Sequence, residues 1–217
     1  MLRSKNNVGC PSHETATPSN DVPRIYLAGP DVFLRNAVEI GERKKSLCEK
    51  YGFEGIFPID VEADMRGISK REAGLHIGQL NESLIRTCQI VLANITPFRG
   101  PSADVGTACE IGFARGLGLI VFGYTNVRTT FVERSVEWLG TSVRRDRQKR
   151  ARDANGMVLE DWDMVDNLML ESCIVSSGGS LVTHNAPSSK VFMDLKGFEL
   201  CLEKIKATYP MLTSRNY

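Results

Sequence analysis

Two carboxylates, Asp104 and Glu110, stand out because of the residues around them. The neighbours of Glu110 are small or apolar, namely Thr107, Ala108, Cys109, Ile111, Gly112 and Phe113. Burying a charged side chain on such a helix face costs free energy unless the charge is paired or has a function. Small neighbours also let a ligand approach closely. The spacing fits equally a glutamate that points to water. A ligand site centred on Glu110 is therefore one of two hypotheses.

The two carboxylates belong to a predicted strand–loop–helix unit. Residues 90–93 form an apolar run typical of a buried strand. The loop after it is indicated by Pro97, Gly100 and Pro101, and either Ser102 or Asp104 can cap the helix that follows. A carboxylate at a helix start is favoured by the helix dipole. In an α/β sheet this loop lies at the carboxyl edge of the strands, where ligands bind.

Further apolar runs alternate with helical patterns along the chain. Strands are predicted at residues 24–28, 52–58, 119–124 and 181–182, and helices at 36–51, 77–88 and 191–207 and from Asn167 onward. This alternation implies a parallel sheet with right-handed crossovers. We expect an α/β fold, a doubly wound, flavodoxin-like parallel sheet of about five strands between helices.

The length of 217 residues suits one domain with tails. Residues 1–23 are polar and broken by prolines, which predicts a flexible N-terminal tail. The domain is expected over 24–207, with a mobile insertion at about 126–155, and residues 208–217 are expected to form a C-terminal tail. The basic run at 144–152 favours a solvated connection over a nucleic-acid site, because no aromatic residues interleave it.

Composition argues against several classes of function. A net charge of +1 gives no general attraction to nucleic acid or membranes. No apolar run approaches the ~20 residues of a membrane span, and the N-terminus lacks an apolar signal core. The six cysteines are scattered without metal spacing, which predicts reduced thiols and a cytoplasmic protein. The chain has no P-loop, no dinucleotide motif after the first strand and no GxSxG.

An ordered set of motifs resembles the nucleoside 2-deoxyribosyltransferase family. The matching stretches are Tyr26-Leu27-Ala28-Gly29-Pro30, Ala93-Asn94-Ile95-Thr96-Pro97-Phe98-Arg99-Gly100, Asp104-Val105-Gly106-Thr107, Glu110-Ile111-Gly112 and Asp166-Asn167-Leu168-Met169. They occur in the family's order, so the resemblance covers roughly residues 24–206. Each motif alone is weak, and the ordered set is fairly specific.

The resemblance implies roles for particular residues. Glu110 matches the family's nucleophile, Tyr26 the tyrosine that holds it, and Asp104 the sugar-site aspartate. Substrate-binding positions by the same resemblance are Gly29, Asp60, Asn81, Gly106, Asn167 and Met169. Asn167 is expected to cross from a neighbouring subunit, which implies a homo-oligomer. Ordinary structural roles remain open for these positions, such as a plain turn at Gly29 and a surface polar residue at Asn81.

Asn81 departs from the family pattern, which often has an aspartate at this position. An amide can hydrogen-bond a base but cannot donate a proton as an acid does. Proton delivery to the leaving base would then fall to Asp104, to solvent or to the easy protonation of the base itself.

Three functions are therefore carried forward. The first is transfer of 2′-deoxyribose between nucleobases through a glycosyl ester on Glu110, with 2′-deoxynucleosides and free bases as substrates and with no metal or organic cofactor. The second is a nucleoside or nucleotide N-glycosidase on the same scaffold. The third is a non-catalytic nucleotide-sensing module, against which the set Tyr26, Asp104 and Glu110 argues.

Overall fold

The computed structural model describes residues 22–60, 66–140 and 143–213. Its main sheet has five strands in the order β2-β1-β3-β4-β7, and every neighbouring pair is parallel. The strands are β1 (Arg24–Ala28), β2 (Glu54–Ile56), β3 (Ile90–Asn94), β4 (Ile120–Thr125) and β7 (Leu181–Thr183). The predicted flavodoxin-like α/β fold is confirmed.

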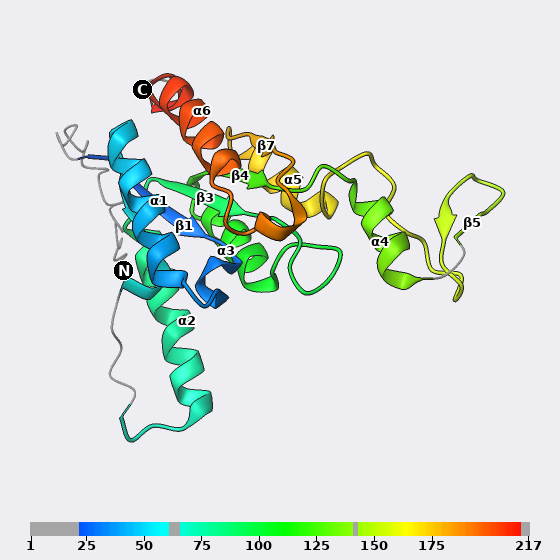
Figure 1. Ribbon diagram of the computed structural model, residues 1–217, viewed down its shortest axis with the longest axis horizontal. Coiled ribbons are helices and arrows are strands. Elements are labelled where there is room, and N and C mark those ends of the chain that lie inside the picture. The colour runs from blue at the N-terminus through cyan, green and yellow to red at the C-terminus, as the bar shows by residue number, and fades with distance from the viewer. Residues whose placement is uncertain (1–21, 61–65, 141–142, 214–217) are drawn as a thin grey trace, which may run out of the picture.

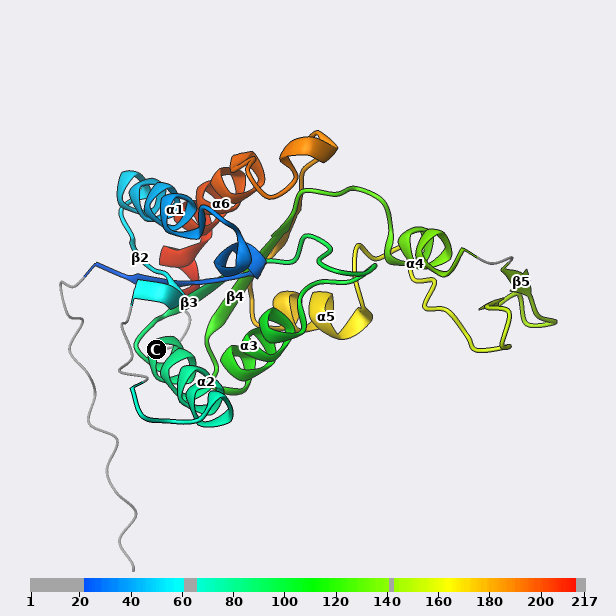
Figure 2. The ribbon, with the colours of Figure 1, turned by 60° about the horizontal axis from the view of Figure 1, so that its bottom comes forward.

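Helices cover both faces of this sheet (Figures 1 and 2). One face carries α1 (Ala37–Tyr51) and α6 (Lys196–Thr213), and the other carries α2 (Lys70–Arg86), α3 (Val105–Gly116) and α5 (Leu168–Ser176). Short 3-10 helices at Pro30–Phe33, Pro58–Asp60 and Ser188–Lys190 lie in the connections. The central strand β3 is buried along its whole length.

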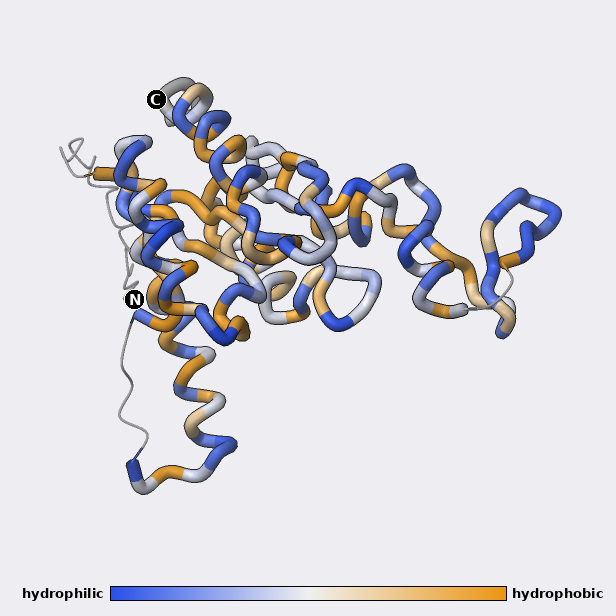
Figure 3. Tube along the Cα trace, in the orientation of Figure 1, coloured by the Kyte–Doolittle hydropathy of each residue, from blue (hydrophilic) through white to orange (hydrophobic). Residues whose placement is uncertain are grey.

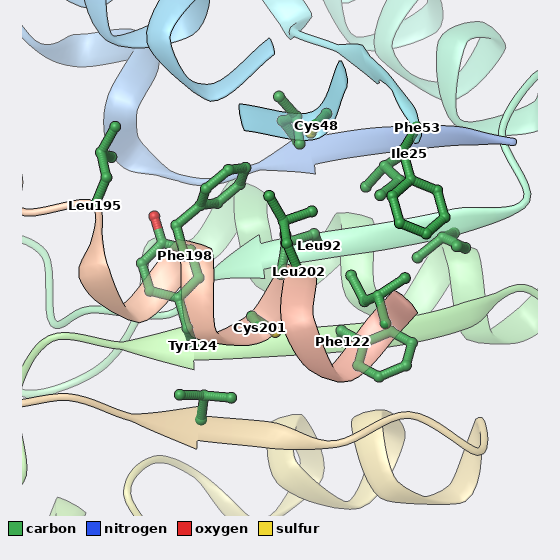
Figure 4. Close-up of a cluster of buried hydrophobic side chains, with 14 of the residues drawn as sticks. Ile25, Cys48, Phe53, Leu92, Phe122, Tyr124, Leu195, Phe198, Cys201 and Leu202 are labelled. Carbon is green, nitrogen blue, oxygen red and sulfur yellow. The ribbon is translucent and has the colours of Figure 1, made fainter. Parts of the chain in front are cut away.

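Each face of the sheet has its own apolar core, because side chains alternate along a strand. Ile90 and Leu92 of β3 pack under α1 and α6, whereas Val91 and Ala93 pack under α2, α3 and α5. Figure 4 shows the first core, in which Phe198 and Leu202 of α6 lie against the sheet. In Figure 3 the strands in the interior of the body carry mostly hydrophobic colour. Burial of this kind contributes about 25 cal/mol per Å² of apolar surface.

Helix α2 begins at Lys70, earlier than the predicted residue 77. Ser69 caps it by accepting the backbone N–H of Glu72 at 3.2 Å, and the Glu72 carboxylate accepts the N–H of Ser69 at 2.7 Å. The hydrophobic pattern of the sequence did not predict these first helical turns, because they extend beyond the body of the protein (Figure 1). Residues of the first turns are accordingly exposed, including Leu75 and Ile77.

The predicted insertion at about 126–155 contains regular structure. It forms an arm that projects from the body, with helix α4 (Phe131–Leu139) and a small hairpin of β5 (Arg144–Arg145) and β6 (Ala151–Arg152) (Figures 1 and 2). Asp146 holds the hairpin turn by accepting the N–H groups of Gln148 at 2.9 Å and Arg150 at 3.0 Å. The basic run is thus a hairpin ordered by its one internal carboxylate.

The chain ends also differ in part from expectation. Helix α6 runs to Thr213, so the predicted tail at 208–217 begins as helix. The predicted N-terminal tail lies almost wholly outside the described residues. Within the described ranges, no helix combines the length and apolar character that a membrane span requires.

Candidate active site

Tyr26 and Glu110 meet at the junction of β1 and α3. The Tyr26 hydroxyl donates a hydrogen bond of 2.6 Å to Glu110 Oε1, although the two residues are 84 positions apart. Tyr26 has no exposed surface, so its ring is fixed by the core under α3. The pair exists because β1 lies beside β3, and α3 begins in the loop that follows β3. Glu110 is thus held by a rigid donor.

The electrostatics of the pair favour a titrating carboxylate and a permanently protonated phenol. Burial raises the pKa of Glu110 to about 7; the hydrogen bond from Tyr26 opposes this shift, and the nearby charge of Asp104 adds to it. Burial, and then the charge of Glu110, raise the pKa of Tyr26 far above its usual value. Tyr26 therefore remains a donor at every physiological pH, and Glu110 changes charge near neutrality.

Of the two capping residues proposed from the sequence, Ser102 and Asp104, Asp104 is the N-cap of α3. Its Oδ2 accepts the N–H of Thr107 at 3.0 Å and the Thr107 hydroxyl at 3.2 Å. A Cβ added at Gly106 would lie 3.0 Å from Asp104 Oδ2. Glycine at position 106 therefore leaves room for this carboxylate at the start of the helix.

A cavity of about 190 Å³ opens between α2 and α3 beside Glu110. It is lined by Gly78, Asn81, Glu82 and Ile85 of α2 and by Gly106, Cys109, Glu110 and Phe113 of α3. Of the residues singled out from the sequence, the cavity brings together Asn81, Gly106 and Glu110. Glu82, Cys109 and Phe113 were not predicted. Phe113 had a signal in helical spacing, because a residue three positions after Glu110 shares its helix face. Glu82 and Cys109 are the direct sequence neighbours of Asn81 and Glu110.

Tyr26 and Asp104 are not among the residues that line this cavity, and neither are Asp60 and Gly29. Asp60 caps its own turn by accepting the N–H of Phe57 at 3.1 Å and pairs with Lys45 at 2.9 Å. Gly29 has a φ of 154°, and a Cβ there would lie 2.6 Å from Asp31 Oδ2 and 2.7 Å from Asn94 Cβ. Glycine is thus required where the loop after β1 packs on the end of β3. A role for Asp60 or Gly29 in substrate binding stays a prediction.

Asn167 and Met169 also lie outside the cavity of their own chain. Asn167 is the N-cap of α5, where its Oδ1 accepts the N–H of Met169 at 3.0 Å and its amide donates to Glu160 Oε1 at 2.6 Å. The Met169 side chain is 61% exposed. Met169 therefore lies on the surface of the single chain, and Asn167 is half-buried.

Known proteins resemble this chain in sequence and fold. The family model for nucleoside 2-deoxyribosyltransferase matches residues 25–169. An uncharacterized protein of Schizosaccharomyces pombe is 30% identical over 168 residues, which cover 73% of this chain and 80% of that protein.

A solved 2-desoxiribosyltransferase from Leishmania mexicana is 27% identical, with a TM-score of 0.49 over 68% of this chain and 85% of its own. A conserved Enterococcus faecalis protein, 16% identical, shares the fold with a TM-score of 0.50 over 86% of this chain and 99% of its own. Since the family model spans well over half of the sequence, this chain belongs to the nucleoside 2-deoxyribosyltransferase family.

Proposed function

We propose that this protein transfers 2′-deoxyribose from a deoxynucleoside to a free nucleobase through a covalent ester on Glu110. The observation that carries the proposal is the 2.6 Å hydrogen bond from buried Tyr26 to Glu110, at the wall of a cavity. A carboxylate held in this way presents its second oxygen to a ligand. A surface glutamate would have no need of a buried phenol as its partner.

The reaction balances over two displacements. In the first, a Glu110 oxygen bonds to the anomeric carbon, and the base leaves with the electron pair of the C–N bond and takes up a proton. In the second, a nitrogen of the incoming base forms the new C–N bond and loses its proton to water, while the ester C–O bond breaks and its electron pair returns to the Glu110 carboxylate. Both transition states resemble an oxocarbenium ion, which a carboxylate stabilises, and two inversions give net retention.

The neighbouring residues have matching roles in this proposal. Asp104 accepts a hydroxyl of the sugar and orients it, which turns proximity into rate. Asn81 hydrogen-bonds the base from the α2 wall of the cavity. An amide has no proton to give as an acid, so the leaving base draws its proton from water or from another group in the site.

Assembly is the second part of the proposal. We expect a homo-oligomer in which Asn167 and Met169 complete a neighbour's sugar site, because they lie outside their own cavity and Met169 is exposed. The arm supports this view, since Trp138 and Trp162 are each 64% exposed, and a second subunit would bury them. Light scattering should show a dimer or larger assembly at working concentration. An active monomer would contradict this expectation.

Chromatography of a deoxynucleoside incubated with the protein tests the proposed activity. With a second free base present, a new deoxynucleoside should form. Release of free base and deoxyribose regardless of the added base would indicate an N-glycosidase instead. Absence of any turnover, with saturable binding of a nucleotide, would indicate a sensing module.

Removing the Tyr26 hydroxyl should shift the pH dependence of activity. In Tyr26→Phe the hydrogen bond that lowers the pKa of Glu110 is lost, so that pKa should rise by about one unit. At pH 7 the ionised fraction of Glu110 then falls from about one half to about one tenth, and kcat/KM should fall about fivefold. The acid limb of the pH profile should move upward with it. A profile with an unmoved limb would exclude Tyr26 as the group that tunes Glu110.

A further inference from the structure

A buried carboxylate outside the cavity, Asp166, is bonded to the loop that precedes Asp104. Asp166 is 1% exposed, and it accepts the Ser102 hydroxyl, the N–H of Ala103 at 2.9 Å and the N–H of Asn167 at 2.7 Å. An uncompensated buried carboxylate is costly. These donors explain how the fold tolerates this one, and they tie the start of α5 to the start of α3.

The same loop is held from a second side by Arg134 of α4. This guanidinium is 8% exposed and donates to the carbonyl oxygens of Pro101 at 2.7 Å, Thr129 and Val165. It also lies 3.5 Å from Asp166 Oδ2. The planar fork of arginine suits such a junction, because it holds several oxygens in a fixed geometry. Residues 101–103 are therefore clamped between an arginine and an aspartate.

The clamp acts on the residue immediately before Asp104. Its hydrogen bond to the Ala103 N–H fixes the backbone that leads into the N-cap, while Thr107 fixes the Asp104 carboxylate from the helix side. We propose that Asp166 is a positioning residue, which sets Asp104 against the sugar through the Ala103 N–H and the Ser102 hydroxyl. This inference rests on the proposed function, in which Asp104 binds the sugar.

The position of Asp166 also links two surfaces of the molecule. One carboxylate holds the loop of Asp104 and, through its own next residue, the backbone of Asn167. In the proposed oligomer Asn167 serves a neighbour's sugar site. The Asn167 side chain is held separately by Glu160 and the Met169 N–H, so we expect Asp166 to act on sugar transfer through Asp104.

A double-mutant cycle with Asp104→Asn separates positioning from general stability. Asp166→Asn keeps the side-chain shape but replaces one acceptor oxygen by an amide NH2, which cannot accept a hydrogen bond from the N–H and O–H donors around it. On its own it should lower kcat/KM for deoxyribosyl transfer by about tenfold to a hundredfold. In the Asp104→Asn background it should cost less than about threefold, because a residue that acts through Asp104 has nothing left to position. Losses that multiply in the double variant, or an Asp166→Asn variant within about threefold of the parent protein, would overturn the proposal.

Two further variants complete this test, one as a matched control and one as a substitute for Asp166→Asn. Asp153→Asn is the matched control, because Asp153 is also buried and accepts two backbone N–H groups, those of Asn155 and Met157 at 2.9 Å, but lies in the arm. It should change activity by less than about twofold. If Asp166→Asn does not fold, Ser102→Ala removes only the hydroxyl donor and should cost about threefold to tenfold, again only when Asp104 is present.

Hydrogen exchange gives a readout that does not depend on turnover. The amides of residues 103–107 should exchange at least about tenfold faster in Asp166→Asn than in the parent protein and should be unchanged in Asp153→Asn. Unchanged exchange in Asp166→Asn would overturn the clamp itself. Faster exchange in Asp166→Asn, combined with a parent protein that transfers no sugar, would support the clamp and contradict the proposed function.

Discussion

Glu110→Gln should lose at least about a thousandfold in kcat for sugar transfer, which corresponds to about 4 kcal/mol of barrier. Glutamine keeps the shape of the side chain and can still accept the Tyr26 hydrogen bond, but its neutral amide cannot form the glycosyl ester. Steady-state kinetics of base exchange measure this loss. Glu49→Gln, at an exposed position of α1, is the control for the loss of one charge. Activity of Glu110→Gln within about tenfold of the parent, near 1.4 kcal/mol, would refute the assignment.

The same variant should be more stable than the parent above pH 7. The pKa of Glu110 is raised from 4.5 to about 7 by folding, so the folded protein binds more protons than the unfolded chain between these values. Ionisation of Glu110 therefore destabilises the fold as pH rises through this window. A neutral glutamine avoids that cost, which predicts a gain of about 1–3 kcal/mol at pH 8 and none below pH 4. Denaturant unfolding at the two pH values measures it.

Deoxyribonucleosides should be preferred over ribonucleosides by at least about a hundredfold in kcat/KM, near 3 kcal/mol. A ribose 2′-hydroxyl would lie beside the nucleophile, where Gly106 and Cys109 share the cavity wall with Glu110. That hydroxyl also withdraws electrons and slows formation of the oxocarbenium ion. The preference therefore combines a steric and an electronic cause.

The measurement compares deoxyadenosine or deoxyinosine with the matched ribonucleoside, using the same free base as acceptor. Equal kcat/KM values for the two sugars would mean that the cavity does not discriminate at the 2′ position. A general nucleoside hydrolase or another glycosyl transfer would then fit the site better than deoxyribosyl transfer.

Much of the frame around Glu110 was predictable from local patterns. Three features depend only on nearby residues: the strand β3, the loop with its prolines and glycine, and the N-cap Asp104. Each is determined by residues within about one turn or one strand, so it can be predicted from a single sequence. The approach of Tyr26 to Glu110 is different, because it joins residues 84 positions apart. Only the order of strands in the sheet brings them together, and the family resemblance was the sole sequence signal for it.

The arm and the clamp were not predictable for related reasons. The hairpin at residues 144–152 has no hydrophobic period, because its order comes from polar bonds to Asp146 rather than from burial. Asp166 was visible only as part of a motif. Its partners Ser102 and Ala103 lie more than 60 residues away, so nothing local in the sequence reports the contact.

The most direct test of the account is intact-mass spectrometry after reaction with a slow 2′-fluoro nucleoside. Fluorine at the 2′ position destabilises the oxocarbenium-like state, so that the glycosyl ester should accumulate before it breaks down. We expect a mass increase of one sugar per chain, and peptide mapping should locate it on Glu110. An adduct on any other residue, or no adduct while turnover proceeds, would contradict the double-displacement mechanism.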